Sequence, residues 1–127
     1  MPKTKKRILD AARTLFNEYG FSQVTIRMIA LELDMSSGNL NYHFKKREDI
    51  LEALYFEMVA VFDQRVEGVG ASPITLETVK KDVGESLERM IAYRFFWTDL
   101  YYLLRRHPNI KKHFFKAAEA RKKGYEF

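Results

Sequence analysis

Apolar residues recur at helical spacing in several separate stretches of the chain. Between Thr25 and Phe44 this spacing predicts two short helices, the first opened by Thr25 and the second by Ser36. Thr and Ser favour helix starts because their hydroxyls accept hydrogen bonds from backbone N–H groups that lack partners within the helix. The second helix turns Leu40 and Phe44 inward. The stretch is therefore typical of a helix-turn-helix, and its first helix buries Ile26, Ile29, Ala30 and Leu33.

The two predicted helices are separated by Asp34 and Met35. Turns of this kind usually carry glycine, because the backbone there adopts a left-handed conformation that Asp and Asn tolerate best among the other residues. We therefore expect a left-handed Asp34. Spacing alone leaves a second interpretation open, namely two core helices of an unrelated bundle with polar residues facing water.

Further apolar stripes predict helices on both sides of this motif. Before the motif, an N-terminal helix ends at Gly20, which acts as its C-terminal cap. After the motif, a long helix runs from Lys45-Lys46-Arg47 to about Glu67. Gly68, Gly70, Ser72 and Pro73 then break the pattern. Thr75 opens another helix that carries Leu76, Val79, Val83, Leu87, Met90 and Ile91. The segment from residue 93 continues as a helix until Pro108, and a last helix covers about residues 109–123.

Composition supports an all-α protein. The 127 residues are 46% apolar and 31% charged with only three prolines, which favours helices around a real core. The chain has no cysteine, so disulfides and thiolate metal sites are excluded and a reducing cytoplasm is compatible. No apolar run approaches the roughly 18 residues of a membrane span. We expect a cytoplasmic protein without a membrane partner.

The net charge of +5 is distributed unevenly along the chain. Residues 1–47 hold nine Lys or Arg against four acids, residues 48–104 hold five against eleven, and residues 105–123 hold eight against one. The basic beginning and end are compatible with polyanion binding, although basic runs are more often solvated helix faces. For residues 105–123 we favour the solvated face, with salt bridges to the acidic middle segment as a third possibility.

Short blocks of residues between Arg7 and Leu51 form a specific pattern. They are Ile8-Leu9-Asp10-Ala11-Ala12, Leu15-Phe16, Tyr19-Gly20-Phe21, Thr25-Ile26-Arg27-Met28-Ile29-Ala30, Ser36-Ser37-Gly38-Asn39-Leu40, Tyr42-His43-Phe44, Arg47-Glu48 and Ile50-Leu51. In this register the stretch resembles the DNA-binding domain of the TetR family of bacterial transcriptional regulators. Two departures are visible: Leu33-Asp34-Met35 replaces the usual Ala-Gly-Val turn, and Asn41 stands where tyrosine is common.

The resemblance implies which residues meet DNA. Base edges in the major groove are assigned to Ser37, Asn39, Asn41 and Tyr42, because asparagine pairs with an adenine edge and tyrosine stacks on sugar or a thymine methyl. Phosphates are assigned to Thr25, Arg27, Ser36, His43, Lys45, Lys46 and Arg47. Gly38 would let the helix approach the DNA backbone closely, although a glycine here is also tolerated without any role.

The resemblance also implies an architecture. Residues 1–47 form a three-helix helix-turn-helix domain, and residues 48–127 form a linker helix with the start of a helical domain for ligand binding and dimerisation. Family members continue through several more helices, the last two of which form the dimer interface, so we expect either that this chain is a truncated form or that its C-terminal domain is abbreviated. The implied function is a regulator, usually a repressor, that binds a pseudo-palindromic double-stranded DNA operator. The full-length form is expected to be a homodimer that a small-molecule effector of unknown identity releases from DNA.

An aromatic segment between residues 93 and 104 is the candidate effector site. Tyr93, Trp97 and Tyr101 share one face of the predicted helix, and ligand pockets are mostly apolar. Aromatic residues at helical spacing are, however, more often simple core.

Catalytic and metal sites find little support in the sequence. His43, His107 and His113 are scattered, and no two of them have the spacing of a metal site. No nucleophile arrangement or glycine-rich phosphate loop is present, so we expect neither an enzyme nor a cofactor. Two other functions stay open: a helical module that binds a protein partner, and a small-molecule binding protein without sequence-specific DNA binding.

Overall fold

The computed structural model describes residues 3–69 and 74–124, and within them the side chains of residues 3–62 and 74–120. These residues contain helices and no strand, which confirms the all-α fold. The elements in chain order are α1 (Lys3–Tyr19), the short 3-10 helix η1 (Phe21–Gln23), α2 (Ile26–Glu32), α3 (Ser37–His43), α4 (Arg47–Val69), α5 (Leu76–Ala92), α6 (Arg94–Thr98), α7 (Leu100–Arg106) and α8 (Pro108–Gly124).

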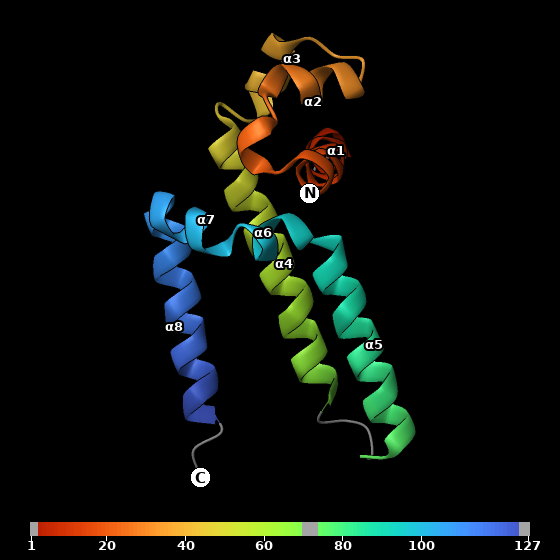
Figure 1. Cartoon of the computed structure of the whole chain (residues 1–127). Helices are drawn as coiled ribbons and strands as arrows, with labels where there is room; N and C mark the ends of the chain where they lie inside the picture. The colour runs from red at the N-terminus through yellow and green to blue at the C-terminus, as the bar shows by residue number, and fades with distance from the viewer. Residues whose placement is uncertain (1–2, 70–73, 125–127) are drawn as a thin grey trace.

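Helices α1, α2 and α3 form a compact unit, which we call the head, around the beginning of α4 (Figure 1). The apolar stripe of α1 faces inward, and Ile29, Ala30 and Leu40 join it from α2 and α3. Gly20 ends α1 as predicted: its φ of 84° lies in the left-handed region, and its N–H donates to the Phe16 carbonyl at 2.9 Å. The predicted three-helix unit is therefore present.

The long helix α4 leaves the head and runs down into the remaining helices, α5–α8, which we call the body (Figure 1). Ile50, Leu51 and Leu54 on its first turns are fully buried and belong to the same apolar core as the head. That core continues into the body through Tyr93, Phe95, Phe96, Leu103 and Ile110. One core therefore spans both sides of the predicted domain boundary between residues 47 and 48, and that boundary stays a prediction. Of the predicted break after α4, Gly68 lies inside the helix, and residues 70–73 lie outside the described residues.

The prediction of one continuous helix from residue 93 to Pro108 is wrong. Tyr93 and Asp99 adopt non-helical conformations, with φ/ψ of −119°/32° and −108°/24°, and they separate α5, α6 and α7. The breaks allow Phe95 and Phe96 of the short α6 to enter the core beneath α1 and α4. Tertiary packing therefore overrides an apolar pattern that continues through both breaks.

Helices α5 and α8 differ in how much of their apolar surface is covered. Thr75 caps α5 as predicted, in a capping box with Thr78, yet no side chain of α5 itself is buried within the described part of the chain. Its apolar stripe is exposed at Leu76, Val79, Val83, Leu87, Met90 and Ile91. By contrast, Ile110 of α8 is buried and Phe114 packs against the core. The Tyr55 hydroxyl and His113 Nδ1 also join α4 to α8 through a hydrogen bond of 2.9 Å.

Candidate nucleic-acid interface

The two helices of the motif are held by their predicted caps. Thr25 has an extended backbone, and its Oγ1 accepts a hydrogen bond from the Met28 N–H at 3.2 Å. Ser36 does the same for the Asn39 N–H at 3.0 Å. A hydroxyl that accepts such a bond can still donate its own hydrogen, so both caps remain able to donate to a phosphate oxygen.

The turn between α2 and α3 has the predicted conformation. Asp34 has a φ of 54°, the single positive φ of a non-glycine residue within the described ranges. Hydrogen bonds from the Asp34 N–H to the Leu31 carbonyl at 3.2 Å and from the Met35 N–H to the Ala30 carbonyl at 3.0 Å close the turn. The left-handed residue reverses the chain so that α3 packs across α2.

One face of α3 is buried and the other lies open to solvent. Leu40 is fully buried and Phe44 partly buried, as predicted. On the outer face Asn39, Asn41 and Tyr42 are exposed, Tyr42 by 85%. Neither asparagine side chain has a hydrogen-bond partner among the described residues. The outer face of α3 therefore offers free donors and acceptors on a rigid, capped helix.

Ser37, Gly38 and His43 complete the surface of α3. Ser37 and His43 are half-buried, and the His43 ring stands edge-on to Tyr42 at 5.2 Å between centroids. A Cβ added to Gly38 would meet nothing within 4 Å, so packing within the chain does not require glycine at this position. That open space is compatible with close approach of a DNA backbone, which remains a prediction.

Cationic side chains flank both ends of the motif. Arg27, Lys45 and Lys46 are exposed, and none of them has an ion-pair partner within the described part of the chain. The half-buried Lys5 also lies beside the motif, although its position was not foreseen: its ammonium lies 5.8 Å from the centroid of the Phe44 ring, at the end of α3. The basic N-terminal run was the signal for this residue, and its contact with the Phe44 ring supplies its place.

Arg47 differs from the other predicted phosphate contacts because its guanidinium is used within the chain. One of its NH groups donates to the carbonyls of Phe21, Ser22 and Val24 at 3.2, 3.1 and 2.9 Å. Its Nε lies 3.5 Å from a Glu48 carboxylate oxygen. This geometry assigns Arg47 to fastening the loop before α2, so we do not retain it among the proposed phosphate contacts.

The three aromatic residues predicted to line an effector pocket do not share a helix face, because the breaks at residues 93 and 99 separate them. Tyr93 is buried, and its hydroxyl donates to Glu57 Oε2 at 3.1 Å. Burial and the Glu57 carboxylate both raise the pKa of Tyr93, while Arg13 acts in the opposite direction. Tyr101 is 75% exposed. Trp97 alone occupies an aromatic cluster, with Phe62, Phe96 and Phe114.

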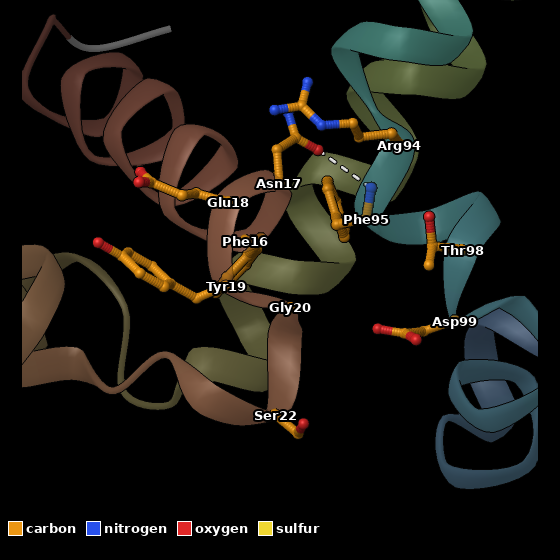
Figure 2. Close-up of a pocket in the computed structure, with 10 residues that line it drawn as sticks. All are labelled: Phe16, Asn17, Glu18, Tyr19, Gly20, Ser22, Arg94, Phe95, Thr98 and Asp99. Carbon is orange, nitrogen blue, oxygen red and sulfur yellow. Dashed lines mark hydrogen bonds between the residues drawn. The ribbon is translucent and has the colours of Figure 1, made fainter.

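A polar groove of about 400 Å³ lies elsewhere, between the end of α1 and the helix α6 (Figure 2). Its walls include Asn17, Glu18, Arg94 and Asp99, and it contains none of the three predicted aromatic residues. Within the described residues, no three His, Cys, Asp or Glu side chains are grouped as a metal site would need. No helix in the same residues has the length and apolar character needed to cross a membrane.

Comparison with known proteins matches both parts of the chain. Residues 8–54 match the family model described as bacterial regulatory proteins, tetR family, and residues 57–125 match the model described as bacterial transcriptional repressor. A TetR-family transcriptional regulator from Marinobacter aquaeolei VT8 has a crystal structure with a TM-score of 0.85 and 32% identity. The alignment covers 94% of this chain and 59% of that one.

Two curated relatives give the same result. The probable HTH-type transcriptional regulator YttP of Bacillus subtilis (strain 168) is 28% identical over 91 residues, covering 72% of this chain and 44% of that protein. The HTH-type transcriptional regulator UidR of Escherichia coli (strain K12) is 30% identical over 80 residues, covering 60% of this chain and 41% of that protein. The chain thus spans less than half the length of these two relatives. It belongs to the TetR family of bacterial regulatory proteins.

Proposed function

We propose that this chain is a DNA-binding transcriptional regulator that reads base sequence with α3. The outer face of that helix carries the proposal: Asn39, Asn41 and Tyr42 are exposed, while Leu40 anchors the opposite face in the core and Ser36 caps the start of the helix. Side-chain amides and a phenol match the donor and acceptor pattern of major-groove base edges. The remaining proposed base contact is Ser37, at the first turn of α3.

Phosphate contacts around the motif would position α3 in the groove. We assign them to the exposed cations Arg27, Lys45 and Lys46, to the cap hydroxyls and His43, and now to Lys5 in place of Arg47. Such contacts fix register without reading sequence, and they make binding sensitive to salt. The proposed group of phosphate contacts is Lys5, Thr25, Arg27, Ser36, His43, Lys45 and Lys46.

The membership of the family supports a finer proposal about regulation. We propose a cytoplasmic repressor that binds a pseudo-palindromic operator as a homodimer and has no catalytic step. A small molecule would release it by binding the DNA-free geometry more tightly than the DNA-bound one. The apolar stripe of α5 is exposed, and the chain covers only part of its longer relatives. The number of protomers bound to DNA, measured by mass photometry or sedimentation of the complex, therefore tests the homodimer.

Trp97 supports a proposal about the effector site. Its ring centroid lies 5.3 Å from that of Phe96 and 6.4 Å from that of Phe62, and its buried Nε1 has no acceptor among the described residues. A buried donor of this kind favours an apolar ligand that brings an acceptor. Trp97 is the only tryptophan, so its fluorescence reports binding directly. A ligand-induced change in Trp97 fluorescence that persists in the Tyr101→Ala variant supports the site. Fluorescence that does not respond to apolar ligands carrying an acceptor argues against it.

The deciding experiment is a salt titration of binding to duplex DNA from upstream of the protein's own gene, beside a scrambled duplex. Sequence reading predicts tight binding to the first duplex alone, with affinity that falls steeply as salt rises. Equal binding to both duplexes would mean a head without a competent dimer or a different operator. Absence of binding at low salt would favour the helical module that binds a protein partner.

A further inference from the structure

Asn17, on the last turns of α1, connects the head directly to the body. Its Nδ2 donates a hydrogen bond to the Ala92 carbonyl at 2.7 Å, and its Oδ1 accepts one from the Phe95 N–H at 3.0 Å. The second bond is the dashed line in Figure 2, at the wall of the polar groove. Both ends of one half-buried amide are therefore bonded to backbone groups 75 and 78 residues further along the chain.

The two backbone groups that Asn17 contacts lack partners within their own helices because of the helix break at Tyr93. Ala92 is the last residue of α5, and Phe95 lies in the first turn of α6. The last carbonyls of one helix and the first N–H groups of the next lack partners within their own helices. An asparagine amide has one donor side and one acceptor side, so it satisfies one group of each kind at once. The contact therefore fits this break and would not fit an unbroken helix.

Other contacts near Asn17 hold α1 against the α5–α6 break but do not fix their relative orientation. The rings of Phe16 and Phe95 pack edge-on at 5.4 Å between centroids, and the Arg13 guanidinium carbon lies 5.5 Å from the centroid of the Tyr93 ring. Apolar and cation–π contacts tolerate sliding, whereas two hydrogen bonds from one planar amide demand both distance and angle. The amide of Asn17 thus selects one orientation among those that ring packing allows.

We infer that Asn17 is a positioning residue that fixes the orientation of the head relative to the body by joining α1 to the α5–α6 break. A displacement of that break, for example by a ligand in the body, would then move α1 and with it α3. This consequence for DNA binding rests on the proposed function. The orientation itself does not, since it is a property of the free protein.

The absence of cysteine makes the orientation measurable. Cysteines introduced as Glu32→Cys on α2 and Lys81→Cys on α5 are exposed sites for two nitroxide labels, one on the head and one on the body. Pulsed electron spin resonance then gives the distribution of distances between the labels. With Asn17 intact we expect one narrow distribution.

Two variants test the amide. Asn17→Leu keeps a similar side-chain size and removes both hydrogen bonds, and we expect it to lose the single narrow distribution. Asn17→Asp keeps the acceptor for the Phe95 N–H but places a carboxylate against the Ala92 carbonyl, and we expect a shift or broadening with less disturbance of folding. The matched control is Asn109→Leu, the same substitution at an exposed asparagine on α8, which should leave the distribution unchanged.

Circular dichroism of each variant separates orientation from folding. A folded Asn17→Leu or Asn17→Asp chain with the parent's narrow distribution would overturn the inference. If Asn17→Leu does not fold, Asn17→Asp decides alone. The distance measurement needs no DNA, so a failure of operator binding in the parent chain would overturn the proposed function and leave the role of Asn17 intact.

Discussion

The guanidinium carbon of Arg47 lies 4.6 Å from the centroid of the Phe21 ring. From this place it also reaches the carbonyls of Ser22 and Val24, so the first residue of α4 holds the loop that leads into the helix-turn-helix motif. The same loop also meets the body, since the His107 ring stands edge-on to Phe21 with 5.6 Å between the ring centroids. Phe21 is therefore contacted both by the first residue of α4 and by the end of α7.

We expect Arg47→Ala to lower the free energy of unfolding by about 2 kcal/mol, because hydrogen bonds to charged groups contribute about 1.5–3 kcal/mol and the carbonyls would lose their donor. Arg47→Lys should recover only part of this loss, since an ammonium lacks the planar fork. Urea denaturation measures both variants. Unchanged stability combined with weaker DNA binding would instead restore Arg47 as a phosphate contact.

Asn39 and Lys46 should affect DNA binding in different ways. Asn39→Ala should reduce the preference for the operator over a scrambled duplex by about 1–3 kcal/mol, because a base contact discriminates between sequences. Lys46→Ala should weaken binding to both duplexes alike and lower the salt slope by about one unit. Titrations of both duplexes at several salt concentrations give these quantities. The assignment of α3 fails if alanine at Asn39 and Tyr42 together leaves operator preference intact.

The helix-turn-helix could be predicted from the sequence because its determinants are local. The Thr25 and Ser36 caps each bond a backbone N–H three residues away, and the conformation of Asp34 depends on a single residue type. Short-range chemistry of this kind is visible in a window of a few residues. The family resemblance then added the assignment of α3 to DNA, which spacing alone left open.

The long-range contacts of Arg47 within the head, and of Asn17 between head and body, could not be predicted in the same way. Arg47 meets carbonyls 23 to 26 residues away, and Asn17 meets the body 75 residues away. No glycine or proline marks the breaks at Tyr93 and Asp99, so the apolar pattern passes through them. Their cause is tertiary, namely the burial of Phe95 and Phe96, and this also explains why the predicted grouping of Tyr93 with Trp97 and Tyr101 does not form.

Asp34 should be replaceable by glycine but not by alanine. Its φ of 54° costs a residue with a Cβ about 1–2 kcal/mol, and Asp is among the residues that tolerate this region best. We expect Asp34→Ala to lower the free energy of unfolding by about 1 kcal/mol and Asp34→Gly not to lower it. Thermal and urea unfolding of both variants provide the measurement. Equal stability of the two variants would show that the turn relaxes away from the left-handed conformation.

His107 should make the fold less stable in mild acid. Burial lowers the pKa of His107 from its usual value of 6.5, with Arg47 and Arg106 acting in the same direction and Glu48 and Glu52 opposing them. The unfolded chain then binds a proton near pH 6.5 that the folded chain resists. This contribution to stability is complete above that pH and is lost as the pH falls towards the lowered pKa of the folded state.

The variant His107→Gln keeps a polar side chain at the end of α7 and removes this titration. Its free energy of unfolding should therefore fall less than that of the parent chain between about pH 7.5 and about pH 5, a window that contains the ordinary histidine pKa. Urea denaturation at the two pH values gives the difference for each protein. If the parent and the variant lose equal stability, the protonation of His107 is not resisted by the fold, and its edge contact with Phe21 must persist in the charged form.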